Sequence, residues 1–269
     1  MDFDFNHIAV PFRMQPGLRR LPDGASHLTP LAADGRLNRE KHVVFEAGRS
    51  RHAVLGFDPS LAINSIVVQA RAMSATAQFN IKTPLELAFE EDLAVLDGAT
   101  GTLPWLCVCV PSHWAPEDKL GLDFVTVHTP VADNAALRAA SSQLVRLVTG
   151  GRCWERFVWT VTPSPRYDQH PRRHRRADWP VMDDAAAFAA QCFLRAERQT
   201  FFPVGQGTRQ AVFTIRVMLE PLAHAIDTPA KARRLHDSIA SMTDAVLAYK
   251  GLALARRPLL DWLRTQFHR

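Results

Sequence analysis

The stretch FLRAERQTFF, residues 193–202, decides how the C-terminal half of the chain is interpreted. It follows an alanine-rich run, and we predict one helix over residues 184–202. In a helix, Arg195 and Gln199 share a face because they are four residues apart, and Arg198 lies beside them. Such a charged seam is either a solvated surface or the wall of a polar pocket, and the pattern alone leaves both open.

The same predicted face becomes apolar towards its N-terminal end, at Phe188 and Cys192. A stripe that runs from apolar to polar suits an amphiphilic ligand with an apolar ring and carboxylates, which arginine binds bidentately. Glu197 lies off this stripe in a helix. It could pair with an arginine or face a cation.

The rest of the chain gives a mixed order of helices and strands, which favours an α+β domain over a doubly wound sheet. We expect a largely antiparallel sheet with one face covered by helices. Helices are predicted over 83–98, 134–151, 228–251 and 258–267. Strands are predicted over 103–111, 122–131, 155–163 and 209–222, with a short strand pair over 42–48 and 51–58.

Composition limits the classes of function. The chain has 269 residues, is 47% hydrophobic and has a net charge of +5, so it can bury a sizeable core. The N-terminus is neither a signal peptide nor a membrane span, and four cysteines without a C-x-x-C motif indicate free thiols. We therefore expect a cytoplasmic protein, with residues 1–40 wrapping over the surface of a single domain at 41–269.

The basic run HPRRHRR, residues 170–176, is the densest in the chain. It lacks interleaved aromatic residues for base stacking, and the chain has no nucleotide-binding glycine motif, so nucleic acid is not the expected partner. The run is either a solvated loop or a docking patch for an acidic redox protein.

His128 stands at the end of the strand predicted over 122–131, just before Thr129 and Pro130. It is either a hydrogen-bonded structural histidine or a metal ligand. No second histidine or carboxylate lies at ligand spacing, which argues against zinc and non-haem iron. Haem is a cofactor that needs only one protein ligand.

Several segments together resemble the haem-dependent oxidative N-demethylase family, in its alpha, haem-binding subunit. They are PGLRRL, FEEDLAVLD, CVCVPSHWAPEDKLGLDFVTVHTPV, RFVWTV, LRAERQTFFP, AVFTIRVMLEPL and AYKG, and they extend from about residue 10 to 265. The resemblance implies a PAS-like antiparallel sheet with helices packed around a haem pocket that holds haem b. It also implies oxidation of a small secondary amine by O2, with electrons from a separate reductase that carries flavin and iron–sulfur centres.

The resemblance makes His128, in the H-x-P-V motif, the candidate axial ligand of the haem iron. Glu197, Arg198 and Gln199 become candidate catalytic residues. Other motif positions become candidate haem-binding residues: Trp114, Lys119, Arg156, Trp159 and Arg195.

The chain departs from the family pattern at Val158, where the family usually has Asn, and in a longer turn after residue 202. These positions affect the expected amine specificity. PAS domains also act as gas sensors, so the alternative function is a non-catalytic haem-based sensor or carrier. A scaffold subunit that has lost its haem is a third reading.

Overall fold

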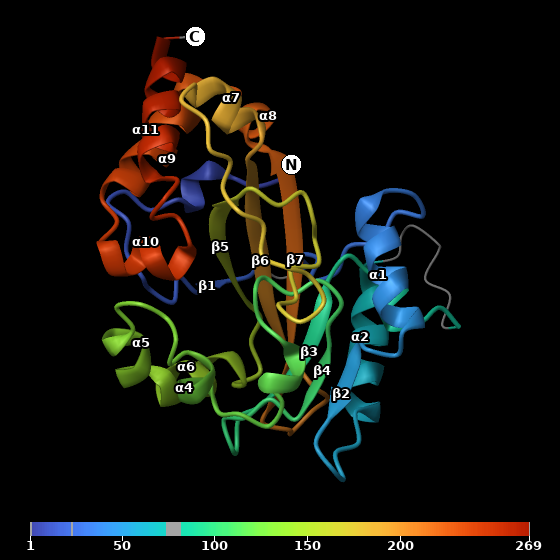
Figure 1. The fold of residues 1–269 in the computed structure, drawn as a ribbon. Coiled ribbons are helices and arrows are strands. Elements are labelled where there is room, and N and C mark those ends of the chain that lie inside the picture. Colours follow the sequence, from blue (N-terminus) through green and yellow to red (C-terminus); the bar gives the residue numbers. More distant parts are fainter. Residues whose placement is uncertain (1, 23, 74–81, 269) are drawn as a thin grey trace.

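The computed structural model of the chain describes residues 2–22, 24–73 and 82–268. In these residues the frame is a seven-stranded sheet with the order β1-β5-β6-β7-β3-β4-β2, and all paired neighbours are antiparallel (Figure 1). The strands are β1 Arg19–Arg20, β2 Arg51–Ala53, β3 Asp92–Asp97, β4 Trp105–Cys107, β5 Trp154–Thr162, β6 Phe193–Pro203 and β7 Gln210–Pro221.

In Figure 1, helices α9, α10 and α11 lie on one side of the strands, and α1 and α2 lie on the other side. The α-helices are α1 Arg36–Glu46, α2 Ser60–Met73, α3 Leu85–Ala88, α4 Phe124–Val127, α5 Ala135–Ala139, α6 Ser141–Val148, α7 Ala185–Ala190, α8 Leu222–Ala225, α9 Pro229–Ala240, α10 Asp244–Lys250 and α11 Arg256–Thr265. Short 3-10 helices are η1 Phe5–His7, η2 Pro116–Asp118 and η3 Gln266–His268. The predicted α+β class with an antiparallel sheet is confirmed.

The prediction of one helix over 184–202 is wrong. Asp184 caps a helix of only six residues, α7, and the chain then continues as the eleven-residue strand β6. β6 pairs along its whole length with β7, and Gly205 and Gly207, both with positive φ, lie in the turn that joins them. Pairing with β7 across this turn and with β5 on the other side has overridden the helix preference of Ala, Arg, Glu and Gln.

Other predicted elements also need correction. The helix predicted over 83–98 is the four-residue α3 followed by β3, and the strand predicted over 42–48 is part of α1. The long helix predicted over 228–251 is divided into α9 and α10, because Thr243 caps a new helix. The strands predicted over 155–163 and 209–222 are confirmed as β5 and β7.

The segment 122–131 is not a strand. Asp123 accepts hydrogen bonds from the backbone N–H groups of Val125 and Thr126, and this N-cap begins the short helix α4. His128 is the C-cap of α4 and not the end of a strand. The position of His128 is therefore set by the C-terminal end of α4.

The two faces of the sheet differ in what covers them. On one face, Trp159, Leu194 and Ala196 pack against the C-terminal helices α7, α8, α9 and α11, and Phe202 and Val212 pack against α2 and α3. The residues that alternate with these point to the other face. That second face carries a cavity of about 550 Å³.

The N-terminal segment contributes to the core. Phe3, Phe5 and Ile8 are buried in the cluster formed with the C-terminal helices, while Arg19 and Arg20 pair with the edge of β5. Among the described residues, no helix is both long and apolar enough to cross a membrane.

Candidate functional site

A cavity of about 550 Å³ lies against the second face of the sheet. Its floor comes from alternate residues of β3, β5, β6 and β7, and its walls come from residues 112–131, from the end of α10 and from Met14 and Gln15. The volume is in the range of pockets that bind small molecules and cofactors. Much of the lining is apolar: Leu96, Leu103, Leu106, Phe124, Val127, Val131, Leu137, Phe201, Phe213 and Ile215.

Three polar side chains of β6 point into this cavity, namely Arg195, Glu197 and Gln199. They share a face because alternate residues of a strand do so. The prediction that Glu197 lies off the stripe of Arg195 and Gln199 is therefore wrong, since it assumed a period of 3.6. Arg198 alternates to the opposite face, where its Nε donates a hydrogen bond of 2.9 Å to Glu155 Oε2.

Ser112 connects two of these side chains. Arg195 Nε donates to Ser112 Oγ over 2.8 Å, and Ser112 Oγ donates to Glu197 Oε1 in a short hydrogen bond. Gln199 Nε2 donates to the other carboxylate oxygen, Glu197 Oε2, over 2.8 Å. The carboxylate of Glu197 is thus held from both sides inside the cavity.

Arg195 is 2% exposed, and its remaining donors bind the backbone carbonyls of Arg166 and Val110, each at 3.2 Å. Burial lowers the pKa of the Arg195 guanidinium, while the charge of Glu197 opposes this. Ser112 therefore bridges the buried guanidinium of Arg195 and the carboxylate of Glu197.

The charges around the cavity are mostly positive. Among its described lining residues, Glu197 is the one carboxylate. The cavity is also lined by five cationic side chains, which are Lys119, Arg156, Arg176, Arg195 and Lys250. Arg156 Nε is buried without a hydrogen-bond partner in the described chain, and burial lowers the pKa of this guanidinium. A cavity of this charge suits a ligand with carboxylates.

His128 lines the same cavity and its ring is fixed by one contact. Its Nδ1 lies 2.7 Å from the carbonyl oxygen of Phe124, which makes Nδ1 the protonated nitrogen, and its ring packs 4.1 Å from the Phe124 ring. Burial lowers the pKa of His128, which favours the neutral imidazole. Nε2 then carries the free lone pair, as a metal-ligating imidazole requires.

His113 is a second imidazole on the cavity wall, and the sequence analysis did not single it out as a site residue. Its backbone has φ of 60°, which is uncommon for a residue other than glycine. Burial lowers the pKa of His113 to about 4, with further lowering by Arg176 and Arg195. His128 instead interacts electrostatically with Arg156 and Lys119, so the two imidazoles lie in different surroundings.

Trp114 and Lys119 line the cavity as well, and Lys119 Nζ lies 3.4 Å from the carbonyl oxygen of Val127. Trp159 borders the cavity, although its ring packs in the apolar cluster on the other face of the sheet. The structure thus brings together all but one of the predicted site residues, and Arg198 is the exception.

Sequence reasoning missed other lining residues with polar side chains, among them Ser112, His113, Tyr249 and Lys250. Each of them lies inside a segment that carries the family resemblance, either CVCVPSHW or AYKG. Proximity to a recognised motif was the available signal. Their joint position depends on contacts between segments far apart in the chain.

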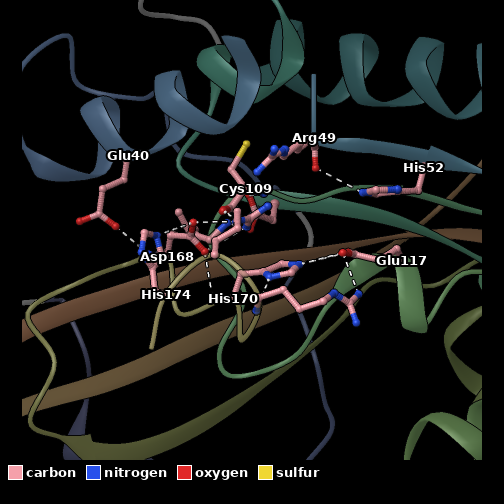
Figure 2. Close-up of polar contacts among 12 residues, drawn as sticks. Glu40, Arg49, His52, Cys109, Glu117, Asp168, His170 and His174 are labelled. Atoms are coloured by element: carbon pink, nitrogen blue, oxygen red, sulfur yellow. Dashed lines mark hydrogen bonds and ion pairs between the residues drawn. The ribbon is translucent and has the colours of Figure 1, made fainter. Parts of the chain in front are cut away.

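The basic run at 170–176 is tied to carboxylates in the structure. Figure 2 shows His170 and Glu117 pointing towards one another. The distance from His170 Nε2 to each carboxylate oxygen of Glu117 is 3.1 Å. Asp168 binds Arg173 and His174 and accepts from the backbone of His170 (Figure 2).

The exposed arginines of this run are also paired. Arg172 binds Glu117 and Asp118, and Arg175 binds Asp178. Arg176 lines the cavity. Much of the positive charge of the run is therefore matched by neighbouring carboxylates.

The residues present fit a haem. The cavity combines an apolar wall, one imidazole with a fixed tautomer, and the guanidinium of Arg156 with an unpartnered buried Nε. These are the groups that hold a haem by its ring, its iron and its propionates. Among the described residues, no group of three or more His, Cys, Asp or Glu side chains is placed to hold a metal ion.

Comparison with known protein families gives a match over most of the chain. The family model described as "Haem-dependent oxidative N-demethylase, alpha subunit-like" matches residues 62–260. This range includes nearly every residue that lines the cavity, apart from Met14 and Gln15. The name of the family indicates a haem-dependent oxidoreductase. The chain belongs to the haem-dependent oxidative N-demethylase, alpha subunit-like family.

Proposed function

We propose that this chain is the haem-binding, oxygen-activating subunit of an oxidative N-demethylase that acts on a small secondary amine. The observation that carries the proposal is the cavity in which His128, Arg156 and Glu197 face one space. These three residues supply an iron ligand, a partner for a propionate and a partner for a cationic amine. The match to the family model supports the same activity.

His128 would bind the iron of haem b through Nε2, because Nδ1 is committed to the carbonyl of Phe124. Arg156, Lys119 and Arg195 are the candidates for contacts with the propionates, and Trp114 adds an aromatic wall. When bound, the haem would supply the activation of O2 that oxidises a methyl group on nitrogen. Loss of that methyl group yields the demethylated amine and formaldehyde.

Glu197 would bind and orient the protonated amine. Its carboxylate is 9% exposed and receives hydrogen bonds from Ser112 and Gln199, so its position is fixed before a substrate enters. Such preorganised groups need no rearrangement during the reaction. Gln199 and Ser112 act as positioning residues for Glu197.

Val158 is paired in register with Glu197 on the neighbouring strand β5, and it lines the cavity. It is the position at which the chain departs from the Asn usual in the family. The apolar side chain of Val158 offers no hydrogen bond to an amine, so recognition of the amine would fall to the neighbouring carboxylate of Glu197. We propose that Val158 contributes to the choice of amine.

Electrons would come from a separate reductase that carries flavin and iron–sulfur centres. The exposed arginines Arg172 and Arg175 are candidates for contact with an acidic redox partner, although each already binds a carboxylate. An acidic surface could compete for them at low ionic strength.

An absorption spectrum of the purified protein tests the proposal first. Protein produced with adequate iron should show a Soret band and about one haem per chain in a pyridine haemochrome assay. His128→Ala should lose the haem or change its spin state, whereas His52→Ala, on the edge strand β2 outside the cavity, should not. Colourless protein that also fails to bind added hemin would refute haem binding.

Turnover separates an enzyme from a haem-based sensor. With a suitable reductase, addition of a secondary amine should accelerate NADPH consumption and release formaldehyde in proportion. A haem protein that binds O2 but shows no amine-dependent consumption would instead be the sensor or carrier.

A further inference from the structure

Lys250 is a cavity residue to which the proposed function assigns no role. It ends α10, and its Nζ donates a hydrogen bond of 2.5 Å to the carbonyl oxygen of Trp159. The same Nζ lies 5.2 Å from the ring centroid of Phe12 and 5.1 Å from that of Trp159. Among the described residues no carboxylate forms an ion pair with it. Lys250 thus lines the cavity, and its amine lies near the rings of Phe12 and Trp159.

Two charged groups act on this amine, the carboxylate of Glu197 and the guanidinium of Arg156. Burial lowers the pKa of Lys250 to about 8, Glu197 opposes this, and Arg156 adds to it. The ordinary value is 10.5, so at neutral pH the neutral amine is on the order of a hundredfold more abundant than for an ordinary lysine. The neutral form is the nucleophile.

The other lysines of the chain offer contrasts. Lys41 is 0% exposed and forms an ion pair of 3.3 Å with Asp92, whereas Lys231 lies at the surface and pairs with Asp227. Lys119 shares the cavity with Lys250 but lies near Val127. Lys250 combines access from the cavity with the absence of a carboxylate partner in the described chain.

We propose that Lys250 is a covalent, reversible capture site for a small aldehyde. Naming that aldehyde as formaldehyde rests on the proposed function, because oxidative loss of an N-methyl group releases it. The site would hold the product inside the cavity until water or an acceptor removes it. This assigns a chemical role to a residue that neither binds the haem nor positions the amine.

The step balances without an oxidant or reductant. The lone pair of the neutral Nζ adds to the carbonyl carbon, a C–N bond forms, and the π electrons of the C=O bond move to oxygen. A proton passes from nitrogen to that oxygen and gives a hemiaminal. Loss of the hydroxyl group with one proton, as water, gives an imine, and addition of water reverses the sequence.

Reductive trapping tests the proposal on the protein as purified. We would add ¹³C-formaldehyde with sodium cyanoborohydride at pH 7, so that hydride converts each imine into an N-methyl amine, and measure every lysine-containing peptide by mass spectrometry. Lys250 should be labelled at least about tenfold faster than Nα-acetyl-lysine in the same solution, as the lowered pKa of Lys250 implies. Equal or slower labelling of Lys250 overturns the proposal.

The pH dependence gives a second readout. Labelling of Lys250 should level off above about pH 8, the value of its pKa, while Nα-acetyl-lysine in the same solution continues to react faster. A Lys250 profile parallel to that of Nα-acetyl-lysine would also overturn the proposal. Lys250→Arg should abolish the fast label, and Lys231→Arg should leave it unchanged.

The trapping experiment is independent of turnover because the aldehyde is added. Fast labelling of Lys250 in a protein that binds no haem would support the capture site while refuting the proposed function. A haem protein with amine-dependent turnover but no fast labelling of Lys250 would support the proposed function and refute the capture site.

Discussion

Glu197 accepts a hydrogen bond of 2.8 Å from the side-chain amide of Gln199, two residues further along β6. Both side chains point into the cavity, and Ser112 holds the second carboxylate oxygen. Because both of its oxygens accept hydrogen bonds, the Glu197 carboxylate has a fixed position in the cavity. The arrangement suits recognition of a small cation more than support of the fold.

Glu197→Gln keeps the shape of the side chain and removes its charge. We expect haem content to stay unchanged and amine oxidation to fall by about tenfold to a hundredfold, as loss of a hydrogen bond to a charged group implies. The measurement is kcat/KM for the amine beside the haem absorbance. Glu46→Gln, at the exposed end of α1, is the matched control. Wild-type turnover in Glu197→Gln would exclude this role for the carboxylate.

Arg198 follows Glu197 in the chain but points to the other face of the sheet. It binds Glu155, which is 5% exposed and also binds Arg19. Arg198→Ala should therefore lower the free energy of unfolding by about 1–3 kcal/mol. Haem content and turnover should not change. A variant that keeps its stability but loses turnover would show that Arg198 acts in catalysis after all.

The sequence predicted which residues lie together around the cavity better than it predicted the helices and strands that carry them. Arg195 and Gln199 share a face in a helix and in a strand alike, so the pair was predicted correctly with the wrong period. Arg198 would lie beside Arg195 and Gln199 in the predicted helix, whereas Glu197 shares their face in the observed strand. Whether residues 193–202 form a helix or a strand is decided by pairing with neighbouring strands such as β7. β6 also pairs with β5, about forty residues earlier in the chain, and the helix preference of single residues does not report such pairing.

His128 illustrates the same limit. Its alternating surroundings indicated a strand, yet Asp123 at the start of the segment caps a helix through Val125 and Thr126. That capping residue was a local signal that the alternation concealed. The contact of His128 with Phe124, four residues earlier, exists only because the segment is helical.

Glu91 should make the stability of the protein depend on pH. Burial raises the pKa of its carboxyl group from 4.5 to about 7, although Thr29 N–H donates to it. A carboxyl group with a raised pKa in the folded chain stabilises folding by its bound proton. This stabilisation is complete below pH 4.5 and is lost as pH rises through about 7. The difference corresponds to roughly 3 kcal/mol.

Glu91→Gln removes this titration and keeps the shape of the side chain. Urea unfolding at pH 5 and pH 8 should show that the variant gains stability relative to wild type at the higher pH. His27, whose pKa burial lowers to about 4, contributes equally to both proteins and cancels in the comparison. A wild-type to variant difference that is the same at both pH values would contradict the prediction.

The exposed arginines of the basic run give a test of partner docking. Arg172→Gln combined with Arg175→Gln should slow reduction by an acidic reductase at low salt and have little effect at high salt, since screening acts over about 10 Å at 0.1 M. Haem content should stay intact. Arg257→Gln, on α11 with 94% of its side chain exposed, is the control. Equal reduction rates of double variant and control at every salt concentration would place the docking surface elsewhere.

Arg195 should be needed for both the fold and the cavity. It is 2% exposed, and its guanidinium binds Ser112 and the carbonyls of Arg166 and Val110. Arg195→Ala leaves three oxygen acceptors of the cavity wall without their charged donor, and each such loss costs about 1–3 kcal/mol. The melting temperature should fall by at least about 6 °C for a chain of this size.

Arg195→Met separates charge from volume, because methionine fills much of the same space without donors. We expect its melting temperature to lie between those of wild type and Arg195→Ala, with haem affinity reduced in both variants. Arg257→Ala, at the surface of α11, should leave both quantities unchanged. If Arg195→Ala keeps the wild-type melting temperature and haem content, the side chain is not a structural part of the cavity wall, and the charge of Glu197 must be balanced by Arg156 or Lys250 instead.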